Sequence, residues 1–514
     1  MLRRLIGGLA LLLLVVLVGI GAAAYWLFSG DGVRRALESQ ATTWLGQKVA
    51  IGGASVGVVP RVAIHLTDVR VGEPARLTLA EVDVSAPLRA LLQRRIEDAD
   101  VAVARSRIEL PLPFGLPASD RTTGANSATS ANATPAVRLV SVRSIRLRDV
   151  TLVSRRRALT VSADASFSTA AGGSQPSADA STLTLTRLSA ASGATALDAS
   201  GTVSLEPRLD AQLRVTANRL DLDDLLALAN AFSPPPSRET TAATRQPARI
   251  AAHITAATVR AAGLDARNFA CDLQVVGNAV TLSPMNIELL GGRYQGSLNA
   301  RLSDTIAATV KSRVTDIDIA QLAAFGGVAG AISGRLSGAT TVSGTGTDFA
   351  GVLRTARGSG TASITNGTIE HLDLVRTVVT FFGRPSAERG GTATDHFDRL
   401  DGQFMLADQI LKADAISLHS PDADLVGQGS LALTTKALDG KADISLSESL
   451  SQVAGTDLYR YTHEGNRIVL PATIGGTLGR PRLGIDARAA VGRGLRNELQ
   501  RRLGGFLDRL NSPQ

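Results

Sequence analysis

Alternation of apolar and polar residues is the feature that most constrains how this chain folds. In residues 62–69 (VAIHLTDV) and 77–84 (LTLAEVDV), aliphatic side chains recur at nearly every second position. Successive side chains of a strand point to opposite faces, so this period predicts strands with one apolar and one polar face. We therefore predict a mainly β fold, elongated and mostly antiparallel. Similar runs, separated by turn residues, are 101–110, 137–153, 183–188, 201–205, 211–217, 251–259, 272–276 and 307–314.

The side chains are small, because aromatic residues make up 4% of the chain and 50 of its 514 residues are Gly. Such a composition suits a sheet one or two layers deep better than a thick core built around large side chains. The single cysteine, Cys271, excludes an internal disulfide and a metal cluster held by thiolates.

The amino terminus predicts a transmembrane helix as a membrane anchor, residues 1–28. The run from Leu5 to Phe28 contains no charged residue, and about 20 apolar residues are enough to cross a bilayer. Arg3 and Arg4 precede this run, which predicts a cytoplasmic N-terminus and a chain that lies mostly outside the cytoplasm. The alternative is a signal peptide cleaved at residues 22–24 (AAA). Anchor positions are Leu5, Leu9, Leu12, Val16, Ile20, Trp26 and Phe28.

The formal net charge of +8 predicts an acidic partner. Export removes nucleic acid from the candidates, so anionic membrane lipid is the acidic surface that remains. The most basic stretch, Arg143 to Arg157, lacks the interleaved aromatic residues on which bases would stack. It is either a charged sheet face that deters edge-to-edge pairing or a contact for anionic lipid headgroups.

Short helices interrupt the strand pattern. Residues 32–46 place their apolar side chains on one face, which predicts an amphipathic helix after the anchor. Three later segments place an Asp between two aliphatic residues, directly ahead of an apolar helical face. Asp is a favoured N-cap, because its carboxylate accepts the free amide protons of the first turn. The three predicted N-caps are Asp221, Asp318 and Asp373.

The tail, residues 488–514, predicts a basic amphipathic helix. Leu recurs every three or four positions from Leu495 to Leu510, and most of the charged residues between them are Arg. Such a helix suits a membrane interface. The alternative is a helix that packs over the end of a sheet and keeps its Arg side chains in water.

No active site is visible in the sequence, so we predict a protein that is not an enzyme and uses no cofactor or metal. Residues 53–57 (GASVG) match a nucleophile elbow around Ser55, but a strand pattern follows where the elbow needs a helix. Residues 427–432 resemble a dinucleotide fingerprint and also lead into a strand. No two of the six His residues have the spacing of metal ligands on one helix face. The polar cluster around His396 is typical of a solvated turn.

Several segments match a known pattern. Residues 358–374, 400–404, 417–421, 425–429 and 470–481 resemble the C-terminal domain of the AsmA family, and residues 46–49 and 60–69 are similar to that family's opening. Together the matches cover both ends of the chain. The positions that carry the family's motifs are Asn366, Gly367, Asp373, Gly402, Gly427, Gly429, Gly476 and Pro481.

The resemblance implies an inner-membrane-anchored periplasmic protein of Gram-negative bacteria that supports outer-membrane biogenesis. It also implies a long, twisted sheet curled into an apolar groove, which binds or conducts phospholipid or lipopolysaccharide. Inward-facing residues such as Ile364 and Val426 would line that groove. The alternative is a non-catalytic scaffold or assembly factor that works with outer-membrane assembly proteins. A hydrolase that uses Ser55 is a third, more distant reading.

These observations divide the chain into six predicted regions. The segment 118–136 is rich in small, mostly polar residues and sets two of the boundaries. Residues 170–180 and 233–247 are similar breaks in the strand pattern. The regions are an anchor at 1–28, an AsmA-like N-terminal β region at 29–117, a linker or loop at 118–136, a middle β region at 137–350, an AsmA-like C-terminal domain at 351–487 and the basic helix at 488–514.

Overall fold

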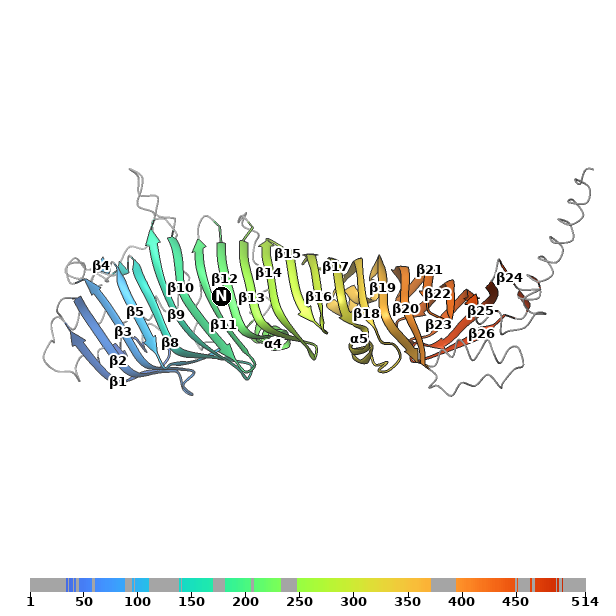
Figure 1. Ribbon diagram of the computed structural model, residues 1–514. Coiled ribbons are helices and arrows are strands. Elements are labelled where there is room, and N and C mark those ends of the chain that lie inside the picture. Colours follow the sequence, from blue (N-terminus) through green and yellow to red (C-terminus); the bar gives the residue numbers. More distant parts are fainter. Residues whose placement is uncertain are drawn as a thin grey trace, which may run out of the picture. The chain divides into compact units, whose positions relative to one another are not determined.

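The protein is mainly β with a few short helices, as predicted (Figure 1). The computed structural model describes residues 34–492 apart from 36, 40, 43–45, 58–60, 88–94, 97, 111–137, 140, 170–180, 205–207, 233–246, 371–393, 449–450, 452–462, 465–466, 487 and 490–491. No helix within this part is long and apolar enough to cross a membrane.

Three predictions fall wholly or mostly outside the described residues and stay predictions. They are the anchor at residues 1–28, the linker at 118–136 and the helix at 488–514. Of the last, Arg488, Ala489 and Gly492 are described, and all three are helical.

The chain forms two compact units. The first consists of Met1–Asp265 and Leu273–Gly277, and the second of Ala266–Asp272 and Asn278–Gln514. Strand β14 (Leu264–Val276) contributes residues to both. The boundaries predicted at 136–137 and 350–351 stay predictions.

The first unit is a mixed sheet in which most neighbours are antiparallel. Strands β1 to β3 form one antiparallel meander and β8 to β12 form another. Between them, β5 and β6 pair antiparallel with β3 and parallel with β8. The strands of this sheet are β1 (Val49–Gly57), β2 (Arg61–Val71), β3 (Leu77–Pro87), β5 (Ala99–Ala104), β6 (Arg107–Leu110), β8 (Val142–Ser154), β9 (Arg157–Thr169), β10 (Ser181–Ser192), β11 (Thr195–Ser204), β12 (Asp210–Asp221) and β13 (Arg249–Ala261). Strands β4 (Arg95–Ile96) and β7 (Arg138–Leu139) form a separate two-stranded parallel sheet.

Parallel neighbours explain where the sequence has its long polar segments. Strands β6 and β8 are parallel, and so are β12 and β13. A parallel pair needs a connection of a dozen or more residues that returns to the starting end of the first strand. The stretches between these strands contain the segments 118–136 and 233–247, which the sequence predicts as linkers. The second connection also includes helix α4 (Leu222–Phe232).

The core of the first unit lies under its first strands. The inward side chains of β2 and β3 are almost fully buried, with Val71 and Val82 both 0% exposed. Leu37 and Ala41, from the predicted amphipathic helix, belong to the same cluster. That helical segment also joins the edge of β1, because Glu38 Oε1 accepts the Ile51 amide proton at 2.8 Å. The prediction of an amphipathic helix is thereby confirmed for its described residues.

The second unit is an antiparallel sheet whose strands pair in chain order from β15 to β23, followed by β25 and β26. Its buried cluster gathers around the last strands and includes Phe397 and Ile444. The strands are β15 (Ala279–Leu289), β16 (Gly292–Arg301), β17 (Ile306–Asp318), β18 (Arg335–Gly346), β19 (Arg357–Glu370), β20 (Thr394–Ala407), β21 (Ile410–His419), β22 (Ala423–Ala432), β23 (Leu438–Leu446), β24 (His463–Glu464), β25 (Arg467–Thr477) and β26 (Arg480–Ile485).

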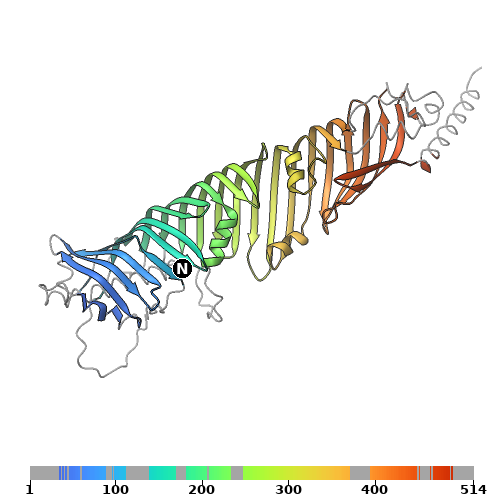
Figure 2. The same ribbon diagram turned by 90° about the horizontal axis from the view of Figure 1, so that it is seen from below.

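Two short helices lie at opposite ends of the strands of the second sheet (Figure 2). Helix α5 (Ile319–Phe325) joins β17 to β18, and α6 (Phe349–Arg354) joins β18 to β19. Helix α6 rests on the end of β18, where a Cβ on Gly346 would come within 2.5 Å of the Gly351 carbonyl carbon. Glycine in β18 therefore makes room for this helix.

Two of the three predicted Asp N-caps are confirmed. Asp318 caps α5, and its carboxylate accepts amide protons from Ala320 and Gln321. Asp221 precedes α4, and its Oδ1 accepts the Asp224 amide proton at 3.0 Å. The third, Asp373, lies outside the described residues.

Left-handed Asp and Asn residues break several strands, a feature that sequence alternation did not predict. Asp149 and Asp316 have φ of 52° and 54°, and the strand register shifts beside each. Each displaced amide still finds a partner, because Ser162 Oγ and Ser337 Oγ accept these protons at 3.0 Å and 3.1 Å. Such bulges bend a strand and increase its twist.

Candidate functional site

Aligned apolar residues cross the strands of the second unit in rows. One row joins directly paired residues of five neighbouring strands, from β15 to β19. Its members are Leu282, Leu298, Val310, Val342 and Gly358.

A second row runs beside the first on the same face of the sheet, four residues away on β16 to β19 and five on β15, where the register shifts. It consists of Tyr294, Val314, Gly338 and Ala362, with Ile287 at its start. Because two residues of a strand advance the chain by about 6.6 Å, the two rows lie roughly 13 Å apart. Together they form what we call the open apolar face.

The open apolar face differs from a core because its side chains are only half-buried. Within the described residues, β15, β16 and β18 contribute no fully buried side chain, although their apolar residues alternate as regularly as those of β2. Apolar surface that stays accessible over several strands is costly in water, which makes this face a candidate surface for binding another apolar group.

Aromatic rings cover the glycines of this face. A Cβ on Gly360 would lie 2.6 Å from Phe404 Cζ, and one on Gly296 would lie 2.7 Å from the Tyr294 hydroxyl oxygen. A ring that lies over a strand glycine replaces the packing that glycine lacks. Burial raises the pKa of Tyr294 above its usual value, although its hydrogen bond with Ser312 acts in the opposite direction. Neither row contains a charged residue, and the strip between the rows holds Gly296, Ser312, Thr340 and Gly360.

Both short helices at the edges of this face expose large apolar side chains. In α5, Leu322 and Phe325 are 37% and 53% exposed, and in α6, Phe349 and Leu353 are 75% and 57% exposed. In α6 the Val352 side chain is buried, whereas Phe349 and Leu353 are exposed on the same helix. Both helices therefore add exposed apolar side chains at the ends of these strands.

The predicted motif positions of β19 form part of the packing beside the open face. Asn366 has φ of 51°, a left-handed conformation that Asn tolerates better than most residues. Gly367 lies opposite Phe397, whose ring occupies the place of a Cβ. Asn366 therefore has a backbone role, and Gly367 leaves room for the Phe397 ring.

Other motif positions have backbone roles. A Cβ on Gly427 would lie 2.5 Å from the Lys441 carbonyl oxygen, so neighbouring strands approach too closely there for a side chain. Gly429 has a milder contact of 3.1 Å with the Asp439 carbonyl oxygen, and Gly402 has ordinary space around it.

The last two motif positions lie together. Gly476, with φ of +83°, pairs with Pro481 where β25 turns into β26. Asp373 lies outside the described residues. The structure thus spreads the described motif positions over five strands, β19, β20, β22, β25 and β26, and it does not bring them together in one site.

One predicted groove residue is wrong. Ile364 is 7% exposed and belongs to the buried cluster, but Val426 is 61% exposed on the opposite face. The neighbouring Leu425 takes the inward position, at 4% exposed. Two adjacent aliphatic residues leave the phase of alternation undecided, and sequence alone selected the wrong one.

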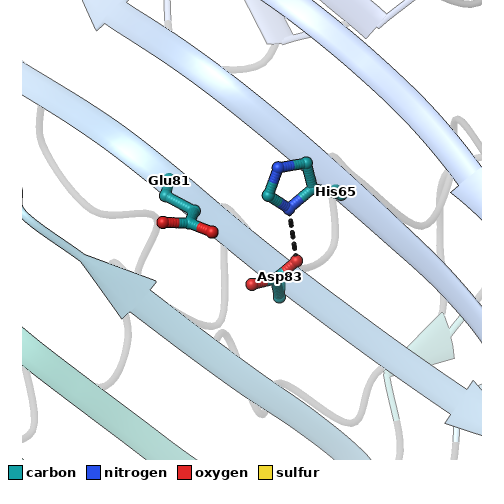
Figure 3. Close-up of side chains that lie close together, drawn as sticks. All are labelled: His65, Glu81 and Asp83. Atoms are coloured by element: carbon teal, nitrogen blue, oxygen red, sulfur yellow. Dashed lines mark hydrogen bonds and ion pairs between the residues drawn. The ribbon is translucent and has the colours of Figure 1, made fainter.

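Three side chains on the outer face of the first unit have the types that bind a divalent cation. Figure 3 shows His65 of β2 beside Glu81 and Asp83 of β3. Their ligand atoms all lie within 4.8 Å of one another. His65 Nδ1 lies 2.5 Å from Asp83 Oδ1, while Glu81 forms an ion pair of 2.5 Å with Arg105. A cation would compete with Arg105, so this cluster is equally a set of exposed surface ion pairs.

Sequence analysis missed this cluster because its members are far apart in the chain. The direct pairing of His65 with Asp83 depends on the hairpin register between β2 and β3. Ser55, in β1, is paired with His65 on the other side. Ser55 therefore lies within a strand, and not on the strand-to-helix turn of a nucleophile elbow.

Two other candidates have structural roles. Three residues of the basic stretch pair with carboxylates: Arg143 with Asp100, Arg148 with Asp164 and Arg157 with Asp224. These pairs favour a charged sheet face over a free headgroup contact.

The single thiol is also buried. Burial raises the pKa of Cys271 to about 11, with a further contribution from Asp272. This thiol therefore stays protonated near neutral pH.

Comparisons of the chain with protein-family models, curated proteins and solved structures find no match.

Proposed function

We propose that this protein is anchored in a bacterial inner membrane, lies mostly in the periplasm and supports outer-membrane biogenesis by binding or conducting phospholipids. The observation that carries the proposal is the open apolar face of β15 to β19. Its rows are apolar, uncharged and only half-buried. In this proposal the face lines a groove for acyl chains.

The physical chemistry supports acyl chains over other ligands. Each methylene group removed from water contributes about 0.8 kcal/mol, so a long chain is held without any specific residue. Small side chains such as Val310 and Ala362 leave space above the sheet, and no charged group interrupts the two rows. A surface of this kind favours a chain of methylenes, which makes no directional contacts.

The cellular part of the proposal rests on the sequence. The uncharged run from Leu5 to Phe28 supports a membrane anchor. The resemblance of residues 358–374 and 470–481 to the AsmA family supports a periplasmic location and a role in the outer membrane. Lipopolysaccharide is the second candidate cargo.

The test is mass spectrometry of lipids that copurify with the full-length protein. Val342→Asp introduces a charge into the first row, and Ser343→Asp introduces the same charge one residue away on the exposed face. We expect phospholipid with the wild type and with Ser343→Asp, and a strong loss with Val342→Asp. Equal lipid in both variants would remove the support for the proposal.

An empty but folded wild-type protein would favour the alternative function, a scaffold for outer-membrane assembly proteins. Copurification of such proteins without lipid would support that reading directly. Full function of Ser55→Ala in a complementation assay would exclude the hydrolase reading.

A further inference from the structure

The face of the second sheet opposite the open apolar face has its own depression. It has a volume of about 680 Å³ and crosses β15 to β19. Its walls are two rows of outward side chains. One row is Ser297, Lys311, Thr341 and Ser359, and the other contains Arg313 and Thr361.

The charge in this depression is unbalanced. Lys311 and Arg313 are both exposed, and within the described part of the chain neither forms an ion pair. Their directly paired neighbours on β16 and β18 are neutral: Ser297 and Thr341 for Lys311, and Gln295 and Ala339 for Arg313.

Several cations elsewhere on the sheet surfaces pair with carboxylates. Examples are Arg105 with Glu81, Arg148 with Asp164, Arg357 with Asp408 and Arg399 with Asp401. In the depression, by contrast, two cations lie on the same strand two residues apart, and no Asp or Glu is among the described residues that line it.

These residues match one class of ligand. An Arg guanidinium binds phosphate through two parallel hydrogen bonds, and a Lys ammonium adds a second, more mobile charge. Serine and threonine hydroxyls both donate and accept hydrogen bonds, as sugar hydroxyls require. The volume lies within the usual range of about 300–1,000 Å³ for small-molecule sites.

We propose that the depression binds a phosphorylated sugar, with Lys311 and Arg313 on the phosphate and the hydroxyls of Ser297, Thr341, Ser359 and Thr361 around the ring. The site lies on the face opposite the proposed acyl-chain groove. It therefore does not depend on the proposed function.

The experiment is isothermal titration calorimetry of the full chain with glucose 1-phosphate, with glucose and inorganic phosphate as comparison ligands. The double variant K311Q/R313Q removes both charges. K412Q/K441Q is the matched control, because it removes two exposed lysines from the same face of the same unit outside the depression. A339F fills the depression without changing the charge.

We expect glucose 1-phosphate to bind more tightly than glucose or phosphate. K311Q/R313Q should weaken binding at least about tenfold, because hydrogen bonds to charged groups are lost. A339F should also weaken it, whereas K412Q/K441Q should stay within about twofold of the wild type, the scatter expected for a distant exposed charge. Val342→Asp should leave sugar phosphate binding intact, which separates this proposal from the lipid groove.

A second arm identifies the source of the sugar phosphate. Phosphatidylcholine vesicles that contain lipid A present a sugar phosphate as a membrane headgroup. The same vesicles without lipid A are the control. Binding to lipid A vesicles alone, lost in K311Q/R313Q, would assign the site to a glycolipid headgroup. Binding to glucose 1-phosphate as well would assign it to soluble sugar phosphates. The proposal is overturned if the wild type binds neither, or if K412Q/K441Q loses as much affinity as K311Q/R313Q.

Discussion

The first strands of the first unit and the middle strands of the second unit share one sequence pattern but differ in what lies over it. In β2 and β3 the inward residues are buried, and the helical segment with Leu37 and Ala41 completes the cluster. In β15, β16 and β18 the same alternation leaves the inward residues half-buried. Alternation therefore specifies a two-faced strand, and only the covering element decides whether the apolar face is a core or a binding surface.

The same contrast occurs within the second unit. Phe397 lies over Gly367 and is 1% exposed, whereas Phe404 lies over Gly360 on the open apolar face. Both rings cover a directly opposite glycine. One ring fills a core and the other forms part of a surface.

A buried charge should separate the two regions most strongly. Val82→Asp places a carboxylate where the side chain is 0% exposed, and an uncompensated buried charge costs about 3–5 kcal/mol. Val342→Asp adds the same charge to a half-buried position and should leave the fold intact. Hydrogen–deuterium exchange of peptides from β3 and β18 checks both. Protection of β18 that falls as far as that of β3 would show that the open face is a core.

Removal of the two rings should give a smaller difference. Phe397→Ala should destabilise the second unit by about 3–5 kcal/mol, as expected for a large buried side chain. Phe404→Ala should cost only about 1–2 kcal/mol, since part of its surface already faces water. Urea unfolding followed by circular dichroism measures both, and equal losses would argue against the open position of Phe404.

Acid should lower the stability of the first unit through protonation of Asp100 in β5. Burial alone would raise the pKa of this carboxyl, but hydrogen bonds from Arg143 and Ser144 hold it below its usual value of 3.8. A lowered folded-state pKa stabilises the fold above pH 3.8, and this contribution is lost as the pH falls through the folded value.

Asp100→Asn should therefore lower stability at neutral pH by about 1–3 kcal/mol and flatten the dependence between pH 5 and pH 2. Unfolding of both proteins over that range provides the measurement. Parallel pH curves for the wild type and the variant would contradict the role assigned to Asp100.

The smallest expected effect concerns the helix beside the open apolar face. Asp318→Ala removes the N-cap of α5 and should cost about 1 kcal/mol, whereas Asp318→Asn keeps an N-cap acceptor. Hydrogen exchange in residues 319–325 should rise in the first variant and stay near the wild type in the second. The same rise in both would mean that the charge of Asp318, and not the cap, holds α5.

Much of this arrangement was predictable from local pattern. Alternation found β2 and β3, and the Asp between two aliphatic residues found the caps of α4 and α5. These features depend on neighbours in sequence, which a single chain displays directly.

Alternation alone does not predict which residues of a strand face the core, nor which residues of neighbouring strands are paired. Leu425 and Val426 are adjacent aliphatic residues, so the sequence does not decide which one faces the core; the strand register turns Leu425 inward. The depression around Lys311 and Arg313 depends on which residues of β16 and β18 lie opposite them. Parallel pairing of β12 with β13 was also invisible, since its only sequence trace is a long polar connection.

The central claim, that the open apolar face of β15 to β19 binds acyl chains, is tested most directly by photocrosslinking in cells. A benzophenone amino acid at position 342 would point into the face, and the same group at position 343 would point to the opposite side. We predict lipid adducts from position 342 and none from position 343. Adducts at both positions in equal amount, or protein adducts alone at position 342, would contradict the account.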